Sequence, residues 1–342
     1  MPSLDLYWVR IPLHEPFRIS SGAVSVKDAI LVEYEGRWGE ASPMAGAFYS
    51  AETPESTWSA LERMTPEVLR NPAVDLDSIV EGEPFAKAGM VGALLGAEWL
   101  EAKPRPVPSG VAIGIYDTTD ELLERVERYL GEGYRRVKIK IQPGWDIEPV
   151  RRVRERFPST PLMVDANAAY TLADAAVFAE LDRFGLMMYE QPLGRHALEE
   201  MAELSRRVGT PICADESAES LDQLERIIAL GAASIINVKI QRVGGLRNAV
   251  QMRDRARAAG LDCWVGTMPE LGVASAEAIR LATLEGFVYP TDVESSARWY
   301  TDDIVDPPIA IDREGYLHAG AHRVDRAKLE KYTVRRACYR EP

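Results

Sequence analysis

Cysteine is scarce in this chain of 342 residues, which contains only three. Cys213 and Cys263 lie inside strand-like runs, Cys338 lies near the end, and no two of them form a Cys-x-x-Cys pair, so we interpret them as small core or surface residues. Long apolar runs are also missing, which argues against a helix that spans a bilayer. The first residues lack the basic and apolar regions of a signal peptide. We therefore expect a cytoplasmic protein without a membrane partner.

Positive charge is in the minority, with 40 Lys and Arg against 53 Asp and Glu and a formal net charge of −13. No basic stripe is present to neutralise phosphates, which argues against nucleic-acid binding. Hydrophobic residues make up 46% of the chain, enough for a large core. The length exceeds the roughly 250 residues of a minimal barrel of alternating strands and helices, so one barrel with a smaller accessory domain is the expected partition.

Charged residues close a series of strand-like apolar runs at a regular spacing. Three of these runs end in Asp165, Glu190 and Asp215, each 25 residues after the one before. One period earlier, residues 136–140 end in Lys140, and 24 residues after Asp215 comes Lys239. A strand and its returning helix take about this many residues, and such repeats close into a barrel whose sites lie at the carboxyl ends of the strands. The sequence therefore predicts an α/β barrel with five charged residues at one rim.

The first hundred residues do not follow this period. Antiparallel strands are predicted at 4–10, 29–34 and 37–41, the last two joined by a tight turn, and helices around 54–63 and 85–100. The run 103–108 is rich in proline and marks a boundary. Within the barrel, Thr118 is predicted to begin a helix with a capping box, and residues 287–290 to form the eighth strand. We predict an N-terminal α+β capping domain at 1–103, a barrel at 104–306, and a C-terminal segment at 307–342 that completes the capping domain.

The three acids predict a metal site. Carboxylates that converge at one rim repel one another unless a cation neutralises them, and an all-oxygen site suits Mg²⁺ better than Zn²⁺, with Mn²⁺ as a substitute. Asn167 and Glu216 lie just beyond two of the acids and are predicted to support them. Taken singly, each acid is better explained as a helix cap or an ion-pair partner, but their common phase favours a metal.

The two lysines predict proton chemistry. Burial, a nearby cation and, for Lys140, the neighbouring Lys138 on the same strand face all lower the pKa of an ammonium group, which makes it a base. A metal that holds a substrate carboxylate stabilises the dianion formed when an adjacent C–H bond loses its proton. We therefore predict Lys140 and Lys239 as catalytic residues. The alternative for Lys239 is the Schiff-base lysine of an aldolase-like barrel, which has no need of three metal-binding acids.

At the level of motifs, the chain resembles the enolase superfamily in its muconate-lactonising subgroup, over nearly its whole length. The resemblance implies a (β/α)7β TIM-like barrel with an α+β capping domain, Mg²⁺ bound by Asp165, Glu190 and Asp215, and an acid/base pair of Lys140 and Lys239. The motifs that carry it are Lys138-Ile139-Lys140, Asp165-Ala166-Asn167, Glu190-Gln191-Pro192, Asp215-Glu216-Ser217 and Asn237-Val238-Lys239.

Two segments, 239–245 and 295–304, are similar to those of the o-succinylbenzoate synthases and the related N-succinylamino acid racemases. The first resemblance implies syn elimination of water from a cyclohexadiene carboxylate in menaquinone biosynthesis, with Lys140 as base and Lys239 as a fixed cation. The alternatives are an N-succinylamino acid racemase or dipeptide epimerase on the same scaffold, and a non-catalytic barrel. Arg242 has two open interpretations: a residue near the second lysine that serves racemisation, or a salt bridge to a strand-end acid.

Substrate preference is assigned to loops. The apolar loops 17–22 and 43–49 are predicted to exclude water from the barrel mouth, Pro269 departs from the family's usual seventh-strand motif, and Asp292-Val293-Glu294 is similar to the Asp-x-Asp with which dipeptide epimerases hold an ammonium group. We expect a small-molecule carboxylate substrate and a homo-oligomer. The residues predicted to set substrate preference are Phe17, Ser20, Phe48, Tyr49, Met268, Asp292 and Ser295.

Overall fold

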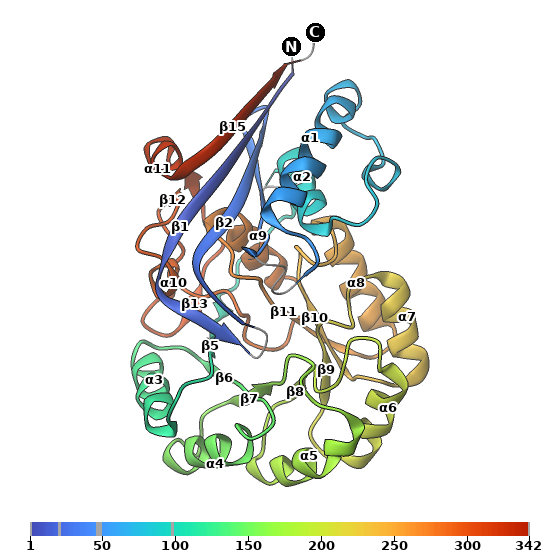
Figure 1. Ribbon diagram of the computed structural model, residues 1–342, viewed down its shortest axis with the longest axis vertical. Helices are drawn as coiled ribbons and strands as arrows, with labels where there is room; N and C mark the ends of the chain where they lie inside the picture. The colour runs from blue at the N-terminus through green and yellow to red at the C-terminus, as the bar shows by residue number, and fades with distance from the viewer. Residues whose placement is uncertain (1, 20–21, 46–49, 97–98, 341–342) are drawn as a thin grey trace.

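The computed structural model describes the chain except for residues 1, 20–21, 46–49, 97–98 and 341–342 and the side chains of 17–23. An open antiparallel sheet lies above a ring of strands and helices, and both ends of the chain lie together at the far end of this sheet (Figure 1). Among the described residues, no helix is both long and apolar enough to cross a membrane.

The antiparallel sheet is built from both ends of the chain. Its order is β15-β1-β2-β3, formed by β1 (Ser3–Ile19), β2 (Gly22–Tyr34), β3 (Arg37–Ala41) and β15 (Thr333–Arg340). The predicted tight turn is confirmed, because Glu35 and Gly36 both have positive φ, as a two-residue hairpin turn requires. The C-terminal strand β15 pairs with β1 from Ser3 opposite Arg340 onward. The residue boundaries of the domains stay a prediction.

Two helices cover this sheet, α1 (Pro54–Arg70) and α2 (Pro84–Leu95). The first runs past its predicted end at residue 63 and contains Pro66 in its interior. Proline usually ends a helix, so this extension is not visible in the sequence. The second packs directly on β3, since a Cβ on Gly39 would lie only 2.0 Å from the carbonyl oxygen of Gly89. Glycine at both positions lets the helix and strand backbones touch, and α2 ends at Gly96, whose φ is positive.

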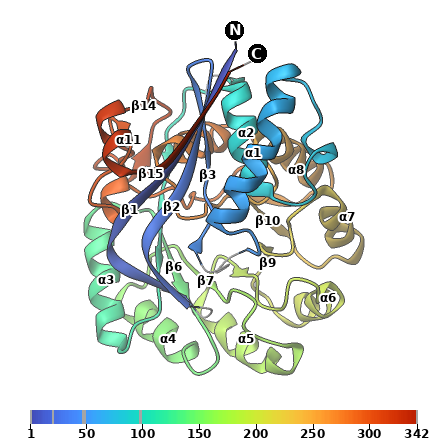
Figure 2. The ribbon, with the colours of Figure 1, turned by 45° about the horizontal axis from the view of Figure 1, so that its top comes forward.

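The prediction that residues 17–22 form a loop is wrong for the described backbone of this segment. Strand β1 continues to Ile19 and β2 starts at Gly22, with these two residues paired, so the segment is the tip of a long hairpin. The register shifts between Pro12 and Phe17, and this irregularity hides the strand alternation in the sequence. In both views the hairpin extends from the capping sheet toward the side of the barrel that contains β6 (Arg136–Lys140) and β7 (Leu162–Asp165) (Figures 1 and 2). An ion pair of 2.9 Å joins Glu15 of the hairpin to Arg125 of helix α3 (Thr119–Gly131).

Seven parallel strands form the curled sheet of the barrel, in the order of the chain. They are β5 (Gly110–Ile113), β6 (Arg136–Lys140), β7 (Leu162–Asp165), β8 (Tyr189–Glu190), β9 (Ile212–Ala214), β10 (Ile235–Val238) and β11 (Asp262–Val265). The helices outside them are α3 (Thr119–Gly131), α4 (Ile147–Arg156), α5 (Ala175–Leu181), α6 (Leu198–Arg207), α7 (Leu221–Leu230), α8 (Leu246–Ala258) and α9 (Gly272–Ala282). The predicted capping box of Thr118 with Glu121 is present at the start of α3.

The eighth strand is not regular, contrary to the prediction. In the described part of the chain, residues 287–291 contribute isolated bridges, Cys263 to Phe287 and Ser109 to Thr291, instead of a ladder. The amide of Gly110 donates to the carbonyl oxygen of Thr291 at 2.8 Å, so this segment still lies between the last and first strands. A short helix, α10 (Ser296–Trp299), follows. The other short elements are β4 (Val107–Pro108), β12 (Val305–Asp306), β13 (Tyr316–Leu317), β14 (Arg323–Val324) and α11 (Arg326–Tyr332).

Candidate active site

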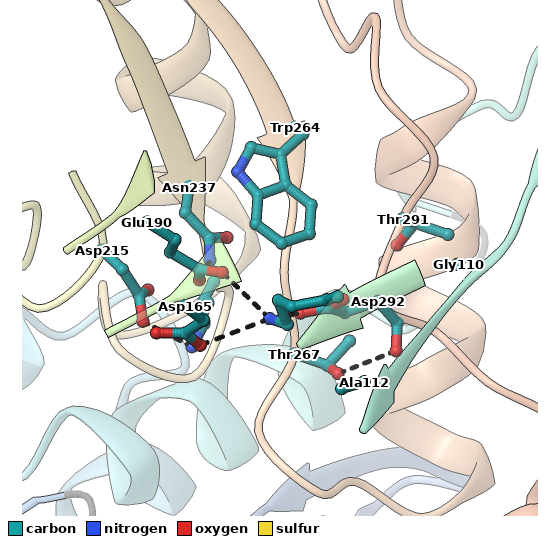
Figure 3. A network of polar contacts seen from close by, with 12 residues as sticks. Gly110, Ala112, Asp165, Glu190, Asp215, Asn237, Trp264, Thr267, Thr291 and Asp292 are labelled. Atoms are coloured by element: carbon teal, nitrogen blue, oxygen red, sulfur yellow. Dashed lines mark hydrogen bonds and ion pairs between the residues drawn. The ribbon is translucent and has the colours of Figure 1, made fainter. Parts of the chain in front are cut away.

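The five charged residues predicted at strand ends meet at one rim of the barrel. Lys140, Asp165 and Glu190 are the last residues of β6, β7 and β8 and pair in register, while Asp215 and Lys239 directly follow β9 and β10. Each of the five residues is at most 4% exposed. Figure 3 shows the three carboxylates gathered side by side. The parallel register carries successive strand ends to the same edge, so the regular spacing in the sequence becomes proximity in space.

The two lysines hold different acids of this cluster. Lys140 Nζ donates to Asp165 Oδ2, and Lys239 Nζ donates to Asp215 Oδ2 at 2.9 Å. The acids therefore lie between the two ammonium groups. Arg242 donates to the other oxygen, Asp215 Oδ1, so it is a salt-bridge partner of a strand-end acid and also a neighbour of Lys239. Both interpretations of Arg242 from the sequence describe its position correctly.

Lys138, two residues before Lys140 on β6, is itself bound by acids of the site. Its ammonium donates to Glu190 Oε2 at 3.1 Å and to Asp292, and it lies 3.7 Å from Asp165 Oδ2 and 5.0 Å from the centroid of the Trp264 ring. Burial alone would lower the pKa of Lys138, but the charges of Asp292, Glu190 and Asp165 outweigh it and hold this pKa well above its usual value. Lys138 is therefore a permanent cation that neutralises part of the acid cluster.

Positive charge is shared unevenly among the acids. Burial first, and then the charge of Asp165, raise the pKa of Glu190 to about 8 although Lys138 opposes the shift. Asp215 is equally buried, yet Arg242 and Lys239 hold its pKa well below the usual range. Within the described ranges, no three His, Cys, Asp or Glu side chains form a ready-made metal site, since ammonium and guanidinium groups lie against the carboxylate oxygens. The chain's own cations therefore stabilise the charge of Glu190 less than that of Asp215.

The predicted supporting residues form a connected path. Lys140 Nζ donates to Asn167 Oδ1 at 2.8 Å, and Asn167 Nδ2 donates to Glu216 Oε1 at 3.1 Å. Asn167 adopts a left-handed conformation with φ of 42°, which turns its side chain back over the strand end. The second oxygen of Glu216 is buried without a hydrogen-bond partner, and burial followed by the charge of Asp215 raises its pKa. Asn167 thus links Lys140 at the end of β6 to the loop after β9.

A narrow cavity of about 40 Å³ opens beside these lysines. Met268 and Asp292 line it as predicted, whereas Ser295 is not among its lining residues. The amide of Ile311 donates to Ser295 Oγ, and the neighbouring Ser296 takes the place in the cavity wall. Ser20, Phe48, Tyr49 and the side chain of Phe17 lie outside the described residues.

The cavity is also lined by Glu270, Trp299 and Tyr300, which were missed as site residues, and by Glu294, which the sequence indicated only through the similarity to Asp-x-Asp. Each of these residues lies in or next to a segment that resembles a family motif. A polar or aromatic side chain at such a position was the signal that could have identified them. Glu294 accepts a hydrogen bond from the amide of Ala112 at 2.8 Å, and burial raises its pKa to about 7. Burial also raises the pKa of Glu270 well above its usual value.

Asp292 is occupied by the chain's own cations. It accepts hydrogen bonds from Lys138 and, at 2.7 Å, from the fully buried Arg136. Burial alone would raise the pKa of Asp292, but Lys138 and Arg136 together lower it to about 2. The comparison of this acid with an ammonium-binding Asp-x-Asp is therefore not supported by its contacts.

Residues 121–321 match the family model described as "Enolase C-terminal domain-like". The chain belongs to the enolase superfamily. It is 39% identical to an o-succinylbenzoate synthase of Geobacillus kaustophilus, over 95% of this chain and 94% of that protein. It is 41% identical to an N-succinylamino acid racemase of an Amycolatopsis species, over 90% and 89%. These matches confirm the family expected from the motifs.

Among solved structures, a member of the enolase superfamily from Listeria innocua superposes with a TM-score of 0.90 and 31% identity, covering 98% of both chains. A muconate lactonizing enzyme from Pseudomonas fluorescens, 23% identical, superposes with a TM-score of 0.87, covering 96% of this chain and 98% of that one. The superfamily's barrel with a capping domain is thus the fold of this chain, as predicted.

Proposed function

We propose that this enolase-superfamily chain is an o-succinylbenzoate synthase, which removes water from a cyclohexadiene carboxylate after taking the proton α to the carboxylate. The observation that carries the proposal is the row of three buried carboxylates flanked by Lys140 and Lys239. Synthases of Geobacillus kaustophilus, Geobacillus stearothermophilus and Bacillus subtilis, 37–39% identical to this chain over 90–95% of its length, support the same activity.

The acid cluster fits a divalent cation. Its donor set is three carboxylates, the ligands that Mg²⁺ prefers. The raised pKa of Glu190 arises from burial and from the charge of Asp165, and a cation bound between these two acids would offset their repulsion. The unpartnered oxygen of Glu216 is a further buried acceptor beside Asp215. Asp165, Glu190 and Asp215 would hold Mg²⁺. When bound, the cation supplies charge that offsets the negative charge developing on the substrate carboxylate.

In this proposal Lys140 takes the α-proton. The electrons of the C–H bond form the new double bond, and the leaving hydroxyl departs on the same face, where the proton held at Lys140 Nζ converts it to water. Asn167 holds that nitrogen at 2.8 Å and so fixes its direction. Lys239 stays cationic on the other side of the acids and stabilises the developing charge. Lys138, bound to Glu190 and Asp292, stays an ammonium and takes no proton.

Racemisation of N-succinylamino acids is the second candidate. The Amycolatopsis relative with this activity is as similar as the synthases. The two lysines are also equivalently buried, each against its own acid, as two bases on opposite faces require. A dipeptide epimerase is less consistent with the contacts, because Asp292 is already bound to Arg136 and Lys138.

The test compares Lys140→Ala and Lys239→Ala with Lys328→Ala, a lysine that pairs with Asp302 and is not among the residues lining the cavity. Lys140→Ala should abolish dehydration of the synthase substrate, measured by absorbance, while Lys328→Ala should not change it. With separate enantiomers of N-succinylphenylalanine in deuterated water, NMR should show that the two site variants keep α-hydrogen exchange for opposite enantiomers. Normal dehydration by Lys140→Ala, or exchange of the same enantiomer by both variants, contradicts the assignment.

A further inference from the structure

Gln241 joins the catalytic barrel to the capping domain. It follows Lys239 by two residues in the turn between β10 and α8, and it is fully buried. Its side-chain oxygen accepts a hydrogen bond from the amide of Ser42 at 2.9 Å, and its side-chain nitrogen donates to the carbonyl oxygen of Glu40 at 2.8 Å. A single amide therefore occupies the free edge of β3, the edge strand of the capping sheet, much as another strand would.

The same short piece of the capping domain also meets the cavity wall. The carboxylate of Glu40 accepts hydrogen bonds from the amides of Leu271 at 2.8 Å and Ala274 at 2.9 Å, at the start of α9. Ser42 Oγ donates to this carboxylate at 2.6 Å. Leu271 directly follows residues 267–270, which line the cavity. Residues 40–42 are thus bound to two barrel loops, one that carries Lys239 and one that forms the cavity wall.

The turn that carries Lys239 is compact. The amide of Val243 donates to the carbonyl oxygen of Lys239, and that of Gly245 donates to the carbonyl oxygen of Ile240, at 3.2 and 2.9 Å. A shift of Gln241 therefore shifts Lys239. The lysine side chain has a flexible four-carbon stem, so its reach to a substrate carbon depends on where this turn is held. A misplacement of about 1 Å in an active site reduces the rate by roughly 100-fold.

We propose that Gln241 is a positioning residue, which uses the capping domain as a fixed support for Lys239 and so sets the reactivity of one face of the substrate's α-carbon. This inference rests on the second candidate function, racemisation, in which each lysine serves one face of the α-carbon. Lys140 is held by a separate path, through Asn167, and does not depend on this contact.

The experiment uses Gln241→Met, which keeps the volume of the side chain but removes both hydrogen bonds. The matched control is Thr65→Val, which removes a buried hydrogen bond of 2.8 Å to Leu61 inside the capping domain. The α-hydrogen exchange of each enantiomer of N-succinylphenylalanine is followed by NMR in deuterated water. The enantiomer served by Lys239 is the one that Lys239→Ala no longer exchanges. For this enantiomer, exchange by Gln241→Met should fall roughly tenfold or more, while the other enantiomer should change little.

An equal fall for both enantiomers, or no fall beyond that of Thr65→Val, overturns the inference, because Gln241 would then serve stability alone. If the wild-type protein exchanges neither enantiomer, the racemase activity is contradicted instead. The inference is then judged by reductive methylation with formaldehyde and borohydride, read by peptide mass spectrometry. Lys239 should become more reactive relative to Lys140 in Gln241→Met, and an unchanged ratio of the two lysines refutes it.

Discussion

Asp292→Asn should destabilise the protein strongly, because Asp292 is the counter-ion of two buried cations. Arg136 is fully buried and Lys138 is 3% exposed, and both donate to the Asp292 carboxylate. Its pKa of about 2, against an ordinary 3.8, corresponds to roughly 2 kcal/mol of stability at neutral pH. Removing one partner of a buried ion pair costs about 3–5 kcal/mol, since the remaining charges stay buried. We expect a loss within this range.

The pH dependence has a definite sign. The folded-state pKa of Asp292 is depressed, so its contribution is complete above the unfolded pKa near 3.8 and is lost as the pH falls toward about 2. The difference between wild type and Asp292→Asn should therefore be constant from pH 5 to pH 7 and shrink below about pH 4. Urea unfolding followed by tryptophan fluorescence measures this difference in the free energy of unfolding. Trp264 is buried in the folded protein, and its ring centroid lies 5.0 Å from Lys138 Nζ, so unfolding of this site changes its surroundings.

A double-mutant cycle with Lys138→Met isolates the pair. The coupling free energy between Asp292 and Lys138 should be about 1–3 kcal/mol. Asp254→Asn, on an exposed carboxylate paired with Arg253, is the control and should change the free energy of unfolding by less than about 0.5 kcal/mol. A change of under about 1 kcal/mol for Asp292→Asn would refute the counter-ion role and return Asp292 to the residues available for a substrate ammonium.

Three further perturbations test the fold and the metal site. Glu277→Gln should stabilise the protein, because burial raises the pKa of Glu277 to about 8 and glutamine resembles the protonated acid. The gain in the free energy of unfolding should grow between pH 4.5 and 8, and a gain that does not change with pH contradicts the burial argument. Gly110→Ala should cost about 1–3 kcal/mol in thermal unfolding, since its Cβ would lie 2.3 Å from Arg136 Cζ, whereas Gly131→Ala has open space and should not destabilise. Adding Mg²⁺ to chelator-treated protein should raise the unfolding midpoint, and Asp215→Asn should lose this rise; an equal rise in both proteins contradicts the three-carboxylate site.

The rim of the barrel could be predicted from the sequence because it depends on local regularity. Each strand is short and buried, and one strand-helix unit takes a nearly constant number of residues, so Asp165, Glu190 and Asp215 recur in phase. Their joint position follows from the parallel register alone. No long-range contact has to be known to place them.

The partners of these residues could not be predicted in the same way. Lys138 was predicted only as a neighbour of Lys140, whereas its ammonium also binds Glu190 and Asp292, 52 and 154 residues away in the chain. Which acid a buried lysine meets depends on side-chain direction across the barrel, and the strand alternation does not specify this direction. The same limit applies to Gln241, whose two partners lie about 200 residues earlier in another domain.

At the eighth strand, the same residues close the barrel and line the cavity. Its ladder is incomplete, and side chains make the missing contacts: Glu294 accepts from the amide of Ala112, and Ser109 Oγ donates to the carbonyl oxygen of Val293 at 2.5 Å. Glu294 and Val293 also line the cavity. A substitution of Glu294 that changes the cavity therefore also breaks a hydrogen bond that closes the barrel. It leaves the amide of Ala112 buried without this acceptor, unless the new side chain can accept the hydrogen bond instead. Glutamine meets this condition, whereas an apolar residue of similar size does not. The closing segment can change substrate preference at little cost in stability only through side chains that keep an acceptor at this position.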